Sequence, residues 1–315
     1  MKVKRILSNI FRRNPDPGKA YYKRQKRYAF SGKTYKNQQQ YEAAITKMYH
    51  SVEKGLSYSN YRPGFGKQNI MDLISAMESY AAAYDVTAFF YETALCTLHQ
   101  YIRKNKEHGH IDPELENRIK LLKGTPNECG GVLEFDAAQD PQKMTFKDFV
   151  QSRHSIRTFD KSPVDIDAVK RAISLAQQTP SACNRQGWRC KIVQTPEKIK
   201  AILANQNGNK GFGEQIKTLL VVTGDLRYFG KLREKHQVFI DGGMYAMNLL
   251  HCLHYEHVAT IPLSASLLVN QENNIRSILN MDKAEVLVMF IGLGSYPSRC
   301  ITTRSERKPP VIEIV

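Results

Sequence analysis

Two short stretches in the second half of the chain decide the fold. The first reads Ser-Arg-His-Ser-Ile-Arg-Thr-Phe over residues 152–159, and the second reads Thr-Pro-Ser-Ala-Cys-Asn-Arg-Gln-Gly-Trp over residues 179–188. The two arginines, imidazole and hydroxyl of the first suit a phosphate dianion, because a guanidinium offers parallel N–H donors. The hydroxyl and amide groups of the second suit hydrogen bonding to a planar heterocycle. Taken alone, the first stretch is better explained as an Arg-rich helix end in solvent.

The residues around these stretches alternate between helical and strand-like patterns. Apolar residues at 166, 169, 173 and 176 predict an amphipathic helix between the two stretches. Short β-rich runs predict strands at 190–195, 218–223, 259–264, 285–291 and 311–315. From residue 146 onward, this alternation predicts an α/β or α+β domain built on a largely buried sheet.

In this order, the two stretches resemble the nitroreductase-like family of flavin mononucleotide (FMN) oxidoreductases. The family pattern is Arg-x-Ser-x-Arg-x-Phe, a helix, and then Pro-Ser-x-x-Asn-x-Gln-Pro-Trp; Gly187 stands where the family usually has proline. The likeness continues in the helix 241–250, in the segment Ile-Gly-Leu-Gly-Ser-Tyr-Pro at 291–297, and in Arg-Lys-Pro at 307–309. It extends over residues 146–315.

The resemblance implies an α+β fold with a mixed sheet flanked by helices, and a homodimer with two flavin sites at the subunit interface. It also implies an oxidoreductase that passes electrons from NAD(P)H through FMN to a small organic acceptor. Because the cofactor carries such chemistry and the protein orients it, no side chain is assigned as catalytic.

Fifteen residues are expected to bind the cofactor on the strength of this resemblance. They are Arg153, His154, Ser155, Arg157, Arg304 and Arg307 around the phosphate, Pro180, Ser181, Asn184 and Gln186 at the ring and ribityl chain, commonly from the other subunit, Asn209 and Lys210 at the pyrimidine edge, and Pro262, Leu263 and Ser264 near flavin N5 and O4.

The first half of the chain has a different character. We divide the sequence into a basic tail (1–40), a helical extension (41–140) and a flavin-binding domain (141–315). Helices are predicted from residue 41, over 70–103, and from Asp112-Pro113, which is a typical helix start. A cluster of polar residues in the extension is more readily explained as surface groups and helix or loop supports than as a site: His50, Glu53, Lys54, Arg62 and Lys67. Residues 50–56 and 62–67 nevertheless resemble bacterial nitroreductase-like proteins associated with surface polysaccharide synthesis.

Residues 1–40 carry most of the net charge of +16, since they hold twelve Lys or Arg and the single acid Asp16. Apolar residues at 3, 6, 7, 10 and 11 follow a helical spacing and predict a short basic amphipathic helix. Two interpretations stay open: the helix docks on an anionic membrane surface, or it packs on protein. Without an RNA-binding motif, nucleic acid is not an expected partner.

Other features place the protein in the cytoplasm, at most peripherally attached to the membrane. No apolar run approaches the 18 to 20 residues that span a bilayer, and no secretory signal is evident. The six cysteines form no Cys-x-x-Cys pair. His251, His254 and His257 repeat at helical spacing, but a helix near the dimer interface explains them better than a metal, and no metal is expected.

Two further expectations concern function and assembly. Gly187 and the segment 261–265 depart from the family pattern, so the alternative to an enzyme is a non-catalytic flavin-binding or scaffold protein that acts through its extension and tail. The β-rich end 311–315 is predicted to pair with the sheet edge of a partner subunit.

Overall fold

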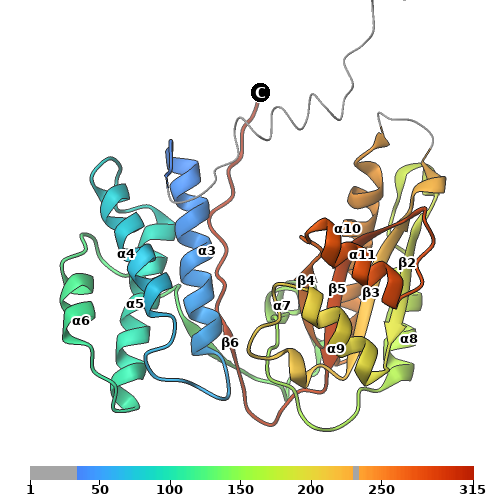
Figure 1. Ribbon diagram of the computed structural model, residues 1–315, viewed down its shortest axis with the longest axis horizontal. Helices are drawn as coiled ribbons and strands as arrows, with labels where there is room; N and C mark the ends of the chain where they lie inside the picture. Colours follow the sequence, from blue (N-terminus) through green and yellow to red (C-terminus); the bar gives the residue numbers. More distant parts are fainter. Residues whose placement is uncertain (1–33, 230–233) are drawn as a thin grey trace, which may run out of the picture.

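The computed structural model describes residues 34–229 and 234–315, which form a helical part and an α/β part. Figure 1 shows the helical part, from α3 to α6, beside the part that holds the larger sheet. The chain runs from the helices into the α/β part and returns at its end along α3. The C-terminal segment therefore connects the two parts.

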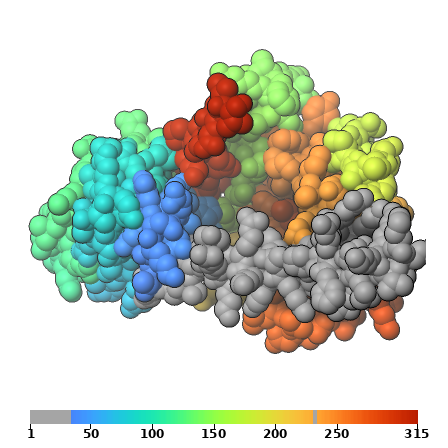
Figure 2. Space-filling model, turned by 90° about the horizontal axis from the view of Figure 1, so that it is seen from above, coloured from blue at the N-terminus to red at the C-terminus, as the bar shows by residue number. Residues whose placement is uncertain are grey.

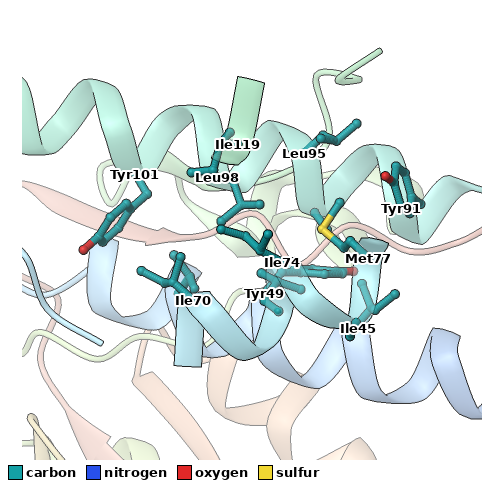
Figure 3. Close-up of a cluster of buried hydrophobic side chains, with 14 of the residues drawn as sticks. Ile45, Tyr49, Ile70, Ile74, Met77, Tyr91, Leu95, Leu98, Tyr101 and Ile119 are labelled. Carbon is teal, nitrogen blue, oxygen red and sulfur yellow. The ribbon is translucent and has the colours of Figure 1, made fainter. Parts of the chain in front are cut away.

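Four helices form the first part: α3 (Gln38–Leu56), α4 (Lys67–Ala81), α5 (Phe89–Glu107) and α6 (Pro113–Lys120). The side chains of Asn37 and Asp112 cap α3 and α6 by accepting from backbone N–H groups in the first turn. The helices share one apolar core, of which Figure 3 shows Ile74, Leu98 and Tyr101 among others. The predicted helix start at Asp112-Pro113 is confirmed.

The predicted single helix over 70–103 is wrong, because α4 ends at Ala81 and α5 begins at Phe89. The Asp85 carboxylate accepts from the Thr87 backbone N–H at 3.0 Å and from the Thr87 hydroxyl at 2.7 Å. Such side-chain bonds compete with helical backbone bonds and favour a turn. Tyr80 then packs edge-on against Phe90, with ring centroids 5.1 Å apart. The turn thus buries aromatic surface that a straight helix would expose.

The larger sheet has the strand order β2-β3-β5-β4, from β2 (Trp188–Val193), β3 (Thr218–Asp225), β5 (Glu285–Gly294) and β4 (Ala259–Ser264). Each neighbouring pair is antiparallel. The central strand β3 is buried on both faces: Leu219 and Val221 belong to one core cluster, and Leu220 and Val222 to the other. The strands predicted at 190–195, 218–223, 259–264 and 285–291 are confirmed, with ends that differ by a few residues.

Helices cover both faces of this sheet. One face carries α8 (Ile166–Ala176) and α10 (Gln237–Tyr255), and the other carries α9 (Pro196–Asn205) and α11 (Val269–Ile278). A short α7 (Phe146–Ser152) and the 3-10 turns η1 (Pro141–Lys143), η2 (Ala182–Asn184), η3 (Gly213–Gln215) and η4 (Leu226–Tyr228) complete the part. The predicted α+β class, a sheet flanked by helices with a helical N-terminal extension, is confirmed. The expected mixed sheet is wrong for the described residues, where every strand pair is antiparallel. The proposed boundaries at 40 and 140 stay predictions.

A small second sheet lies where the two parts meet. It pairs β1 (Val132–Phe135) with β6 (Cys300–Thr303), and β6 contacts α3. Residues 311–315 form no strand within this chain, and Val311, Ile312, Ile314 and Val315 are exposed. Pairing of this segment with a second subunit stays a prediction.

None of the described helices is both long and apolar enough to cross a bilayer. The predicted amphipathic helix near residues 3–11 lies outside the described residues.

Candidate functional site

A basic cavity of about 560 Å³ lies beside the small sheet. Figure 2 shows the C-terminal residues, in red, between the blue and cyan helices and the green and orange α/β part. The cavity is lined by residues from β1, α7, the first motif, α10 and the segment after β6: Leu133, Val150, Gln151, Arg153, His154, Ser155, Met247, His251, Thr303, Arg304, Ser305, Glu306 and Arg307. We call this cavity the basic pocket.

The motif at 152–159 forms one wall of the basic pocket. Helix α7 ends at Ser152, and the chain then continues without regular structure, held by a hydrogen bond from the Ile156 N–H to the Thr260 carbonyl at 2.8 Å. Ile156 is fully buried in the core. Because the apolar residue points inward, it anchors the motif while Arg153, His154 and Ser155 face the pocket.

The second wall is the segment that follows β6. The Arg304 N–H donates to the Gly131 carbonyl at 3.1 Å, and Ser305 Oγ donates to Thr303 Oγ1 at 2.8 Å. Arg307 also lines the pocket, and its guanidinium donates to the Ser305 carbonyl. The structure therefore brings together five of the six residues predicted at the phosphate: Arg153, His154, Ser155, Arg304 and Arg307.

The guanidinium groups of this pocket have unsatisfied donors. Arg153 Nη1 and Arg304 Nε are buried and have no hydrogen-bond partner among the described residues. Burial and the repulsion of Arg307 both lower the pKa of Arg153. Buried donors without a partner cost free energy, so an anion that accepts from these nitrogens is favoured. A phosphate group fits this arrangement, both by charge and by its number of acceptor oxygens.

The histidines around Arg153 are held neutral. Burial and the nearby Arg153 charge lower the pKa of His154, His251 and His254, and for His254 the value is about 4. The Ser152 hydroxyl lies 2.8 Å from Nε2 of His254. Within the described ranges, no group of three or more His, Cys, Asp or Glu side chains is arranged so that it could hold a metal ion.

Arg157 lies behind the wall and does not line the basic pocket. Its side chain is only 6% exposed, and Nη1 donates to the Ser155 carbonyl and to Thr303 Oγ1, both at 3.2 Å. Its Nε has no hydrogen-bond partner within the described ranges. Burial lowers its pKa to about 10, whereas Tyr58 and Glu53 oppose that decrease. Arg157 therefore joins the two walls of the pocket from behind.

The second motif lies elsewhere in this chain. Pro180, Asn184 and Gln186 are exposed, Ser181 is half-buried, and none of them lines the basic pocket. The Ser181 hydroxyl accepts from the Gln186 N–H at 2.9 Å, which fixes the turn. Gly187 is packed tightly, since a Cβ there would lie 3.0 Å from Cβ of Tyr228. This close approach explains why glycine stands where the family pattern has proline.

The remaining predicted residues also lie outside the basic pocket. Asn209 Nδ2 donates to the carbonyls of Leu203 and Gln206, so its amide supports a turn, and the Lys210 carbonyl accepts from the Tyr58 hydroxyl at 2.9 Å. Pro262, Leu263 and Ser264 lie in β4, paired with β5.

The structure adds residues that the sequence did not assign to a site. Gln151, Met247 and Ser305 line the basic pocket, and His50 and Glu53 of α3 lie behind it. His50 and Glu53 were interpreted as surface groups and helix or loop supports; Glu53 is fully buried and is not a surface group, but it does support a loop by accepting from the Gly131 N–H. Their helical spacing of three residues was the available signal. Arg62 and Lys67 are exposed, as predicted.

Comparison with known proteins finds a similarity in the part of the chain that holds the first motif. Residues 150–206 match the Nitroreductase family. This segment contains the first motif, α8, the second motif and β2. The matched segment covers 57 of the 315 residues of the chain.

Two curated relatives and one solved structure illustrate the similarity. The CLA biosynthesis enone reductase of Lactiplantibacillus plantarum is 31% identical over 100 residues, which are 31% of this chain and 46% of that protein. The chloronitrobenzene nitroreductase of Comamonas testosteroni is 31% identical over 77 residues, 24% of this chain and 34% of that protein. This chain therefore matches less than half the length of either relative. The FMN-dependent nitroreductase of Clostridium difficile R20291 aligns with 47% of this chain and 85% of its own, at a TM-score of 0.41 and 19% identity.

Proposed function

We propose that this protein is an FMN-dependent oxidoreductase that passes electrons from NAD(P)H to a small organic acceptor. The observation that carries the proposal is the basic pocket, in which Arg153 Nη1 and Arg304 Nε are buried without a hydrogen-bond partner in residues 34–229 and 234–315. The pocket lies in and beside the segment that matches the Nitroreductase family. A flavin phosphate is a dianion that satisfies such donors.

FMN, when bound, supplies the redox chemistry, because its ring accepts a hydride and returns electrons. The side chains of this chain bind and orient it. Arg153, Arg304 and Arg307 hold the phosphate, the Ser155 hydroxyl adds a donor, and neutral His154 and His251 adjoin them without adding charge. The Pro180–Gln186 loop, exposed in this chain, is free to contact the ring bound to a second subunit.

The first experiment is an absorbance spectrum of the purified protein, with mass identification of any released chromophore. The spectrum is then repeated after anaerobic addition of NADH or NADPH. Bound FMN that bleaches, followed by sustained turnover with a quinone or nitroarene, supports the proposal. Bound FMN that no nicotinamide reduces favours the non-catalytic flavin-binding or scaffold function instead. A protein that binds no FMN, even when it is added, contradicts both the site assignment and the activity.

A homodimer is part of the proposal. Helix α10 exposes apolar side chains along its length, namely Phe239, Ile240, Met244 and Met247, with exposed fractions between 42% and 51%. An apolar helix face of this kind is typical of a subunit interface. The exposed C-terminal segment 311–315 offers a second contact, by strand addition to the sheet of the partner.

The cellular setting that we propose is the cytoplasmic membrane face, near the synthesis of a surface polysaccharide. The support is the resemblance of residues 50–56 and 62–67 and the charge of residues 1–40, most of which lie outside the described residues. Cosedimentation with vesicles that contain phosphatidylserine, but not with pure phosphatidylcholine vesicles, is expected for the full chain. Equal sedimentation with both contradicts membrane docking. Loss of the protein from its cell should lower surface polysaccharide, and an Arg153→Gln variant should not restore it.

A further inference from the structure

Helix α3 belongs to the helical part, yet one of its faces is tied to the wall of the basic pocket. Glu53 is fully buried, and its Oε1 accepts from the Gly131 N–H at 3.1 Å. The Gly131 carbonyl in turn accepts from the Arg304 N–H at 3.1 Å. A single residue, Gly131, thus lies between the Glu53 carboxylate and a residue that lines the pocket.

A second connection runs through His50. Its Nδ1 lies 3.0 Å from Oε2 of Glu53 and 3.4 Å from Oγ of Ser305. Ser305 Oγ donates to Thr303 Oγ1 at 2.8 Å, and both Ser305 and Thr303 line the pocket. The imidazole therefore connects the buried carboxylate to the segment after β6.

The third connection is electrostatic. Arg157 is buried behind the pocket, where it joins Ser155 to Thr303. A buried cation requires a compensating charge, and the groups that favour charged Arg157 are Tyr58 and Glu53, both of the helical part. Since a tyrosine hydroxyl is ordinarily neutral at neutral pH, Glu53 supplies the negative charge.

We infer that His50 and Glu53 are positioning residues for the phosphate group of the cofactor: helix α3 holds the pocket wall in its binding geometry. None of the residues of α3, α4, α5 or α6 lines the basic pocket. Helix α3 therefore sets the affinity of a site that it does not itself line. This inference rests on the proposed function, because the bound anion is taken to be FMN.

The direction in which phosphate affinity changes when Glu53 is replaced distinguishes a positioning role from a purely electrostatic one. If Glu53 acted only as a distant negative charge, its removal would make the pocket more positive and would tighten phosphate binding. If it positions the wall, its removal leaves Arg157 without a counter-charge and loosens Thr303 and Arg304. The two accounts predict opposite changes in affinity.

The test compares FMN with riboflavin, which lacks the phosphate, by fluorescence titration of the apo-protein. In Glu53→Gln, which keeps the size of the side chain, the dissociation constant for FMN is expected to rise about tenfold, a size typical of coupling between distinct sites. Riboflavin binding should change little. Glu53→Asp, which keeps the charge, should recover part of the loss. The decisive quantity is the ratio of the FMN dissociation constant to the riboflavin dissociation constant, because general loosening of the protein lowers both affinities.

Two further variants complete the design. His50→Ala, at a side chain that is 36% exposed, does not bury an unpaired charge and is expected to fold; it should raise the FMN constant about threefold, as for loss of one modest hydrogen bond. Glu78→Gln is the matched control, because Glu78 pairs with Arg118 in the same helical part, away from the pocket. Its FMN to riboflavin ratio should equal that of the wild type.

Several outcomes would overturn the inference. Positioning by α3 is contradicted if Glu53→Gln binds FMN more tightly than the wild type. It is also contradicted if the ratio of the FMN to the riboflavin dissociation constant is unchanged in both Glu53→Gln and His50→Ala, or if Glu78→Gln changes that ratio equally. If the wild type binds FMN normally in such a case, the proposed function survives. If the wild type binds no FMN, the proposed function fails, and the inference fails with it.

Discussion

Nη1 of Arg157 donates to Oγ1 of Thr303 at 3.2 Å, and this bond joins two residues that are 146 positions apart in the sequence. Arg157 belongs to the motif after α7, and Thr303 is the last residue of β6. The basic pocket exists only where these two segments meet. The proposed phosphate site is therefore a tertiary property, which depends on the return of the chain end to the motif.

Arg153→Gln is expected to weaken FMN binding about tenfold to a hundredfold. The substitution removes a charged donor whose Nη1 has no partner in the part of the chain that the structure describes, and hydrogen bonds to charged groups contribute about 1.5–3 kcal/mol. Fluorescence titration of the apo-protein with FMN measures the change. Arg171→Gln is the control, since Arg171 is exposed and pairs with Glu256. Equal affinities in the two variants would remove Arg153 from the phosphate site.

His254 makes stability depend on pH. Burial and the charge of Arg153 lower its pKa to about 4 in the folded protein, whereas an unfolded histidine has a pKa near 6.5. The unfolded chain therefore binds more protons in the interval between these values, so stability falls as the pH decreases from about 6.5 to 4. At pH 4.5, titration of this group lowers the free energy of unfolding by about 2 kcal/mol, because each tenfold change in proton affinity corresponds to about 1.4 kcal/mol.

Urea unfolding at pH 7 and pH 4.5 measures this dependence. His254→Gln removes the titrating group and should lessen the difference between the two pH values by about 2 kcal/mol. His99→Gln, at an exposed position of α5, serves as the control and should retain the wild-type difference. If the two variants respond alike to pH, another group causes the acid sensitivity.

Much of this architecture follows from local sequence patterns. Helix α8 spans the predicted residues 166–176, and the alternation of Leu219 to Val222 places a central strand between two cores. Arg153 and Arg307, predicted as partners, do line one pocket. These features were predictable because helical periodicity, strand propensity and a charged motif are each encoded within a few residues.

The errors have long-range causes. Nothing near Glu53 indicates its burial, because its partner Gly131 is 78 residues away, and a carboxylate between lysine and histidine is typical of a helix surface. The assignment of Asn209 to the cofactor site stays a prediction: its amide suits either a ligand or the backbone, and in this chain it donates to backbone carbonyls. The turn at Asp85 interrupts a sequence of otherwise good helix formers.

Leu98→Ala is expected to destabilise the protein by about 2–5 kcal/mol. Leu98 is fully buried between the helices of the extension, and its truncation leaves a cavity in the core shown in Figure 3. Leu121→Ala is the control, because Leu121 is 74% exposed and a surface substitution changes stability by about 0.5 kcal/mol or less. Chemical denaturation followed by circular dichroism measures both. A small effect of Leu98→Ala would show that the helical part lacks a cooperative core.

The proposed dimer predicts that a charge on the apolar face of α10 dissociates the subunits. Ile240 is 51% exposed on this face, and burying a carboxylate without a partner at an interface costs several kcal/mol. Ile240→Asp should therefore be monomeric in analytical ultracentrifugation at concentrations where the wild type is dimeric. Deletion of residues 309–315 should raise the dimer dissociation constant, because it removes the exposed segment that is proposed to add to the sheet of the partner.

Leu175→Asp provides the control for this experiment. Leu175 is 47% exposed on α8, so the substitution adds the same charge at similar exposure but outside the face of α10. The wild-type dimer should persist in this variant. A dimer that survives dilution in both Ile240→Asp and the truncated chain would place the interface elsewhere.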